Sequence, residues 1–141
     1  MGLHGGARSL KPHLLGHGVC EQVMKTYQAE TKIFKMLMHP ARLAILELLR
    51  DGEECVCHME AVLGYRQAYI SQHLAVLKET GLVEDRKDGW NSYYRVTQPD
   101  VFGIIDLALH ITGGAKEKSP VFANLNQGSS VCGCPKCKVE A

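Results

Sequence analysis

The sequence predicts a mainly α-helical domain that carries one β-hairpin, which makes it an α+β fold. Two observations lead to this prediction. Apolar residues recur at helical spacing in several short segments that glycine or proline separates. One run of strand-forming residues turns at an Asp-Gly pair, the usual signal of a hairpin. At 141 residues the chain has room for one such domain with short tails.

The composition divides the chain into three parts. Residues 1–19 hold several glycines and histidines with little apolar periodicity, so we expect a flexible arm or the remnant of a tag. Residues 20–114 contain the periodic segments and form the predicted domain. Residues 115–141 are mostly polar until the closing cysteines, and we expect a flexible tail.

Four helices are expected before the hairpin. The first runs from Cys20 to Leu37 and is amphipathic. The second begins at Pro40, since proline suits the first turn of a helix, and Gly52 is expected to cap it. The third and fourth are expected over residues 53–63 and 67–80, closed by Gly64 and Gly81.

The hairpin and a last helix complete the domain. The run 83–96 is expected to turn at Lys87-Asp88-Gly89, and Pro99 opens a helix that ends at Gly113-Gly114. Apolar residues cover most of the circumference of this last helix. Such a helix needs a second surface to bury it, and a dimer partner is the natural candidate.

Charge and hydropathy exclude several classes of protein. The chain contains 16 Lys and Arg and 15 Asp and Glu, which gives a net charge of +1. A polybasic nucleic-acid binder is therefore not expected, and any DNA binding must come from local placement of charge. No apolar run is long enough to span a membrane. No secretory signal is recognised, and we expect a cytoplasmic protein.

Two short helices joined by a glycine-containing turn and followed by a hairpin describe a winged helix-turn-helix. The second helix of such a unit enters the major groove of double-stranded DNA. Gln can pair with adenine and Arg with guanine, while Ser and Tyr hydroxyls suit phosphates. A solvated polar helix face is the alternative explanation for these side chains. The candidate DNA-binding residues, taken as those not needed for the core, are Arg66, Gln67, Tyr69, Ser71, Gln72 and His73 on the helix, and Arg86, Lys87 and Asn91 on the wing, with Arg95 at its root.

Three sequence motifs point to a known family of proteins. They are His39-Pro40-Ala41-Arg42-Leu43-Ala44-Ile45-Leu46, then Ile70-Ser71-Gln72-His73-Leu74-Ala75-Val76-Leu77 with Gly81-Leu82-Val83, and Asp88-Gly89 with Tyr93-Tyr94-Arg95. Over about residues 30 to 97 the chain resembles the ArsR/SmtB family of metal-sensing repressors. The resemblance implies a homodimer packed through its first and last helices, and repression relieved when an inducer ion binds. Tyr69 departs from the small or β-branched residue usual there, which puts the base contacts in doubt but not the fold.

Six cysteines suggest what the inducer is. The segment Gly52-Glu53-Glu54-Cys55-Val56-Cys57-His58-Met59 resembles the inducer box of the family's arsenic, antimony, cadmium and lead sensors. Thiolates prefer such soft ions. Residues two apart on a regular helix lie about 200° apart around its axis, so Cys55 and Cys57 are expected to hold one ion only by distorting the turn. The alternative is that both are small buried hydrophobic residues.

The sequence leaves the remaining ligands open. Cys20 lies at the start of the first helix, where cadmium- and lead-type relatives place ligands that reach the partner subunit. The tail holds three closely spaced thiols, Cys132, Cys134 and Cys137, which form a soft-metal site of their own or close over the box, unless they are a scavenger or a redox-labile tail. His58 is a candidate fourth ligand. Zn(II), which usually takes four ligands, is a further candidate ion, but Asp106 and His110 alone are a weak match to the zinc branch of the family.

The function predicted from these observations is a homodimeric, operator-binding transcriptional repressor. Its inducer is expected to be arsenite or antimonite, or cadmium or lead, bound by cysteine thiolates. The alternative is a thiol redox or persulfide sensor on the same scaffold. An enzyme is not expected, because Cys134-Pro135-Lys136-Cys137 follows no strand and opens no helix that would activate a thiol.

Overall fold

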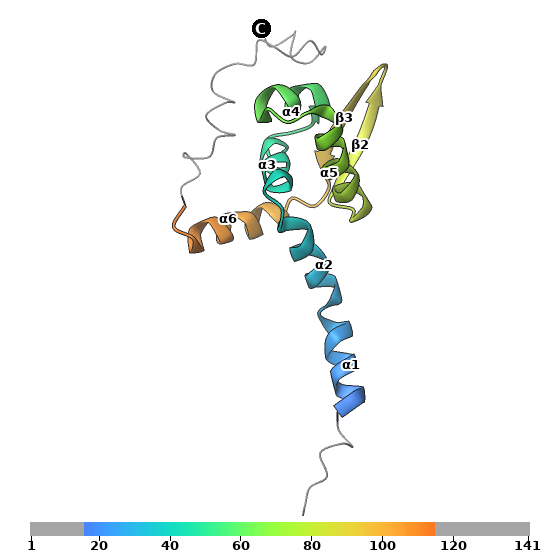
Figure 1. Cartoon of the computed structure of the whole chain (residues 1–141), viewed down its shortest axis with the longest axis vertical. Helices are drawn as coiled ribbons and strands as arrows, with labels where there is room; N and C mark the ends of the chain where they lie inside the picture. Colours follow the sequence, from blue (N-terminus) through green and yellow to red (C-terminus); the bar gives the residue numbers. More distant parts are fainter. Residues whose placement is uncertain (1–15, 115–141) are drawn as a thin grey trace, which may run out of the picture. The chain divides into compact units, whose positions relative to one another are not determined.

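The computed structural model describes residues 16–114. The chain divides between Lys32 and Ile33 into two compact units. The tail predicted over 115–141 and most of the predicted N-terminal arm lie outside the described residues. Figure 1 shows the elements in chain order, which are α1 (Gly16–Thr26), α2 (Gln28–Leu37), α3 (Pro40–Leu48), β1 (Glu54–Cys55), α4 (Val56–Leu63), α5 (Gln67–Glu79), β2 (Val83–Asp88), β3 (Asn91–Val96) and α6 (Val101–Ile111).

The single helix predicted from Cys20 to Leu37 is wrong in two respects. Helix α1 already begins at Gly16, inside the predicted arm, and a turn at Tyr27 separates it from α2. The Oγ1 hydroxyl of Thr26 donates a hydrogen bond to the carbonyl of Gln22 at 2.9 Å. Such back-bonding by a threonine is typical of a bend in a helix, and it lies directly before the turn at Tyr27.

The core of the second unit lies between α3, α4 and α5, which Figure 1 shows together beside the hairpin. Its completely buried large side chains come from all three helices. Leu82 just before β2, Val83 at its start and Val101 at the start of α6 belong to the same cluster. This packing fixes α5, the second helix of the helix-turn-helix, against the other two. The largest buried side chains are Ile45, Leu46, Met59, Ile70, Leu74 and Leu77.

The helix ends were predicted with mixed success. Pro40 opens α3 as expected, and the Nδ1 of His39 caps it by accepting the N–H of Ala41 at 3.2 Å. Gly64 caps α4 in the left-handed conformation, with φ 70°, as predicted. The expected cap at Gly52 is wrong. Helix α3 ends at Leu48, because Leu49 leaves the helical conformation, and Gly52 has φ 153°, outside the left-handed helical region.

The sheet contains a strand that the sequence did not predict. Strand β1 pairs antiparallel with β3, and β3 pairs antiparallel with β2, so the order is β1-β3-β2. The helix predicted from residue 53 therefore begins only at Val56. The hairpin is present, but Asp88 pairs with Asn91. The turn thus consists of Gly89 and Trp90 rather than residues 87–89, and Gly89 has the positive φ of 59° that the first position of a type II′ turn requires.

Helix α6 begins at Val101, and only this residue of the helix is buried. Ile104, Leu107 and Ile111 are exposed. The predicted apolar surface of the last helix is therefore present, and among residues 16–114 no other segment buries these three side chains. Among residues 16–114, no helix is long and apolar enough to cross a membrane.

Candidate nucleic-acid interface and cysteine site

Helix α5 presents most of the predicted DNA-binding side chains to solvent. Its buried residues face the core, so the opposite side of the first two turns is left exposed. Arg66 stands at the N-cap position without making a side-chain cap bond. An unengaged guanidinium at the start of a helix that can enter a major groove is well placed for a phosphate or a guanine. The exposed predicted residues of this surface are Arg66, Gln67, Tyr69, Ser71 and Gln72.

His73 does not belong to that surface. It is buried, and its ring lies 4.3 Å from the ring of His39, centroid to centroid, and 4.5 Å from the ring of Tyr69. Burial lowers the pKa of His73 below the ordinary imidazole value, and the charges of His39 and Arg42 lower it further. The expectation that His73 is not needed for the core is wrong, because its ring packs α5 against the N-terminus of α3.

The basic residues of the wing are already engaged within the protein. The Nη2 of Arg86 lies 2.6 Å from a carboxylate oxygen of Glu53, its Nη1 lies 3.4 Å from Asp88, and the guanidinium sits over the ring of Tyr93. The hydrogen bonds to the two carboxylates raise the pKa of Arg86 further. Arg95 donates to Glu84. Lys87 is exposed, and Asn91 is half-buried at the start of β3.

Cys55 and Cys57 are brought together at the junction between β1 and α4. Cys55 is buried, pairs with Tyr93 in the sheet, and caps α4 by accepting the N–H of His58 on its Sγ at 3.3 Å. The Sγ of Cys57 lies 2.7 Å from that sulfur. The expected distortion of a helical turn is wrong, because Cys55 is extended, with φ −86° and ψ 158°, and precedes the helix. Both sulfurs therefore lie together in the undistorted fold.

A cavity of about 220 Å³ connects the cysteine pair with the DNA-binding elements. The end of β1 contributes Cys55 and the start of α4 contributes Cys57, while the exposed face of α5 contributes two polar residues and the hairpin forms the remaining wall. A ligand held by the thiols would thus contact both parts of the predicted DNA-binding surface. The lining residues are Cys55, Val56, Cys57, Gln67, Ser71, Trp90, Asn91, Ser92 and Tyr94.

The other predicted ligands are not brought to this pair within residues 16–114. In that range no group of three or more Cys, His, Asp or Glu side chains is arranged to hold a metal ion. Cys20 is exposed on α1 in the first unit, and Cys132, Cys134 and Cys137 lie outside the described residues. His58 has its Nε2 3.9 Å from Glu54. Asp106 accepts hydrogen bonds from Arg50, and His110 is exposed on the same helix.

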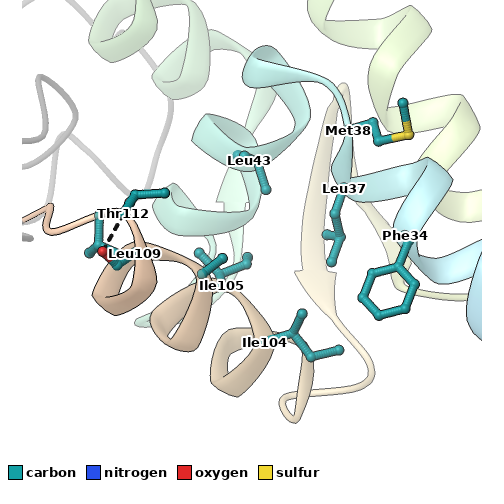
Figure 2. Close-up of a pocket in the computed structure, with 9 residues that line it drawn as sticks. Phe34, Leu37, Met38, Leu43, Ile104, Ile105, Leu109 and Thr112 are labelled. Atoms are coloured by element: carbon teal, nitrogen blue, oxygen red, sulfur yellow. Dashed lines mark hydrogen bonds between the residues drawn. The ribbon is translucent and has the colours of Figure 1, made fainter.

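An apolar groove of about 460 Å³ lies between the end of α2 and α6, with α3 at its floor (Figure 2). Figure 2 shows Phe34, Leu37 and Met38 on one side and Ile104 and Ile105 on the other. Leu43, Leu109 and Thr112 are also labelled there. Phe34 and Met38 are largely exposed. Of the exposed apolar residues of α6, Ile104 lines this groove, whereas Leu107 and Ile111 lie outside it.

Sequence reasoning did not predict the positions and contacts of three residues of this region. Glu53 binds the wing through Arg86, Tyr93 pairs with Cys55, and Trp90 occupies the tip of the hairpin. The first two depend on pairing between residues 33 and 38 positions apart, for which the sequence carries no local signal. Trp90 had such a signal, because a residue that directly follows Asp-Gly is expected in the hairpin turn and therefore at the surface.

Helices α4 and α5 with the hairpin of β2 and β3 form a winged helix-turn-helix, the architecture of a DNA-binding regulator. The model of the bacterial regulatory protein arsR family matches residues 39–85. The chain is 33% identical over 102 residues to the biofilm growth-associated repressor of Xylella fastidiosa strain 9a5c, a match that covers 72% of this chain and 89% of that protein. It therefore belongs to the ArsR family, and it is a DNA-binding transcriptional repressor, not an enzyme.

Two further comparisons bear on the inducer and on assembly. The arsenical resistance operon repressor of Escherichia coli K12 is 45% identical over 67 residues, covering 47% of this chain and 57% of that protein. The solution structure of a homodimeric winged helix-turn-helix domain from Mycobacterium bovis superposes with a TM-score of 0.56 at 29% identity, covering 71% of this chain and 91% of that chain.

Proposed function

We propose that this repressor is released from its operator by a thiophilic metal or metalloid ion bound to Cys55 and Cys57. The observation that carries the proposal is the placement of the two Sγ atoms, 2.7 Å apart, in a cavity shared with α5 and the wing. Soft ions such as As(III), Sb(III), Cd(II) and Pb(II) prefer thiolate ligands. The Sγ of Cys55 accepts the N–H of His58 at the N-terminal end of α4, and the thiolate is the form of cysteine that binds such ions.

The ion needs at least one donor beyond this pair. Trigonal arsenite takes three thiolates, as the family resemblance implies, and zinc usually takes four ligands. The chain offers Cys20 and the tail cysteines Cys132, Cys134 and Cys137 for this role. We propose that one of these thiols, from the same subunit or from its partner, completes the site.

The sheet connects the proposed ion site to the wing, which is part of the predicted DNA-binding surface. Cys55 belongs to β1 and is paired with Tyr93 of β3, so a shift of the sulfur moves the strand that forms one side of the wing. Glu53, two residues earlier, holds Arg86 on the other wing strand. An ion that pulls Cys55 toward a third ligand would therefore displace the wing relative to α5.

The test is release of DNA by metal under reducing conditions. The DNA is an operator duplex selected from a random library by the wild-type protein. We expect arsenite or cadmium to release the wild-type protein, and Cys55→Ser and Cys57→Ser to bind the duplex but ignore both ions. Glu79, on α5, lies outside the cavity, and Glu79→Gln is the control that should respond like wild type. Release of the Cys55→Ser variant at wild-type ion concentrations would refute the box as the inducer site.

A second candidate function rests on the same distance. Two sulfurs at 2.7 Å are poised for oxidation, in which each thiol loses a proton and the pair loses two electrons to an oxidant such as a peroxide or a persulfide. Release by hydrogen peroxide or polysulfide, reversed by dithiothreitol and absent with metals, would favour this candidate. Release by metal in the presence of excess reductant would exclude it.

We also propose that the protein works as a homodimer joined through the groove between α2 and α6. The groove is apolar, and the exposed face of α6 continues beyond it. The homodimeric Mycobacterium bovis domain supports this assignment. Ile104→Glu should yield a monomer in sedimentation experiments and bind the selected duplex weakly, whereas Glu60→Gln, on the exposed side of α4, should leave the dimer intact.

A further inference from the structure

We propose that Trp90 at the tip of the wing binds operator DNA, with its indole ring packed against the sugars and base edges of the groove next to the one that α5 enters. This inference concerns the DNA-bound state and does not depend on the identity of the inducer. Trp90 is the second residue of the two-residue hairpin turn, and it is fully exposed. It is also the single tryptophan of the chain.

Exposure alone does not make a site, because isolated apolar residues are common on protein surfaces. The position of Trp90 provides the second observation. Trp90 lines the same cavity as Gln67 and Ser71, which belong to the exposed face of α5. When that face of α5 enters a major groove, the wing tip lies on the DNA side of the molecule as well.

The charges of the wing favour an apolar contact over an ionic one. Strands β2 and β3 carry three acidic and three basic residues, so their net charge is zero. Arg86 is bound by Glu53 and Asp88, and Arg95 donates to Glu84. Asp85 is bound by Lys78 of α5 at 2.7 Å. Lys87 is the exposed cation for which the described structure records no carboxylate within ion-pair distance, so the wing attracts phosphates weakly and needs another source of affinity.

The indole of Trp90 can supply it. Proteins that enter the minor groove often insert an apolar side chain between or against base steps. The indole N–H can also donate a hydrogen bond to a phosphate or to a base acceptor in the groove. The six paired positions of the β2–β3 register constrain the backbone on both sides of the turn, so the backbone loses little conformational freedom when the ring is buried.

Fluorescence and binding measurements test the proposal together. Because Trp90 is the single tryptophan, we expect its emission to shift to the blue or be quenched when the wild-type protein binds the selected duplex. Trp90→Ala should lose about 5- to 150-fold in affinity, the range expected for one aromatic–base contact, and Trp90→Phe should recover most of it. The unfolding midpoint of Trp90→Ala should equal that of wild type, since the ring buries no area in the free protein.

The salt dependence separates this contact from an ionic one. Trp90→Ala should keep the wild-type slope of log affinity against log salt concentration. The matched control Lys87→Gln should reduce that slope by about 0.9, the value for one lost phosphate contact. Unchanged affinity of Trp90→Ala together with unchanged emission on DNA binding would overturn the proposal. A variant that alters the oligomeric state but not the affinity would also overturn it, because the ring would then contact a second copy of the chain.

Discussion

Arg50 connects α3 to α6, and its replacement by methionine should cost more stability than the loss of any ion pair on the wing. Its guanidinium donates to both oxygens of Glu47 and to both oxygens of Asp106, at 3.2 and 2.9 Å for the latter, and it also lies 4.5 Å from the ring centre of Phe102. The exposed fractions of the Arg50 and Glu47 side chains are 19% and 12%. When the guanidinium is removed, water therefore has little access to replace its hydrogen bonds to Glu47.

The magnitude follows from this burial. Hydrogen bonds to charged groups contribute about 1.5–3 kcal/mol, and a largely buried carboxylate that loses its partner adds a desolvation cost. We expect Arg50→Met to lose about 2–3 kcal/mol of unfolding free energy. The matched control is Arg95→Met, whose pair with Glu84 has exposed fractions of 64% and 48% and should be worth less than about 1 kcal/mol.

Urea unfolding at one fixed protein concentration measures both variants, since the stability of a dimer depends on concentration. The double variant Glu47→Gln with Arg50→Met should recover part of the loss, because it no longer leaves a buried carboxylate unpaired. Equal losses for Arg50→Met and Arg95→Met would refute the reasoning, since burial would then not determine the strength of these pairs.

Two further predictions concern pH and backbone conformation. Because the folded state lowers the pKa of His73, the unfolded chain binds the proton more readily. The contribution of His73 to the free energy of unfolding is therefore complete above about pH 6.5 and is lost as the pH falls through the lowered pKa. His73→Phe should make the unfolding temperature fall less steeply over this pH range. An unchanged pH profile would contradict the burial of His73 as its cause. Gly64→Ala should cost about 1–2 kcal/mol, because φ is 70° there although nothing blocks a Cβ, whereas Gly103→Ala inside α6 should stabilise the helix by about 0.5–1 kcal/mol. Denaturant unfolding of the two glycine variants should show opposite signs.

The sequence predicted the elements whose signals are local. The hairpin follows from Asp88-Gly89 between strand-forming residues, and the order of α3, α4 and α5 follows from helical periodicity broken by glycines. The motifs of the second unit were specific enough to identify the family. These features need no knowledge of distant partners, which is why they could be read correctly.

The errors concern features that depend on partners far along the chain. A two-residue strand such as β1 has no pattern of its own and exists because Tyr93 and Tyr94 pair with it. Without that strand, Cys55 was placed on a helix, and the two thiols were expected to point apart. The ion pair of Arg86 with Glu53 was likewise not predicted, because the two residues are far apart in the sequence. His73 looked like a surface residue until α3 brought His39 against its ring.

Strand β1 determines which part of the molecule we expect to move when the inducer binds. Met59 of α4 and Ile70 of α5 are completely buried in one close-packed cluster, so moving α4 against α5 would open cavities in the core. The wing is held to the cysteine segment by two residues of β1 and by the exposed pair between Glu53 and Arg86. This connection is the weaker of the two, so we expect the wing to move first when an ion pulls Cys55 away from Tyr93. Glu53→Gln should then reproduce part of the release without any ion, while leaving the packing of α4 and α5 and the thermal stability of the core unchanged.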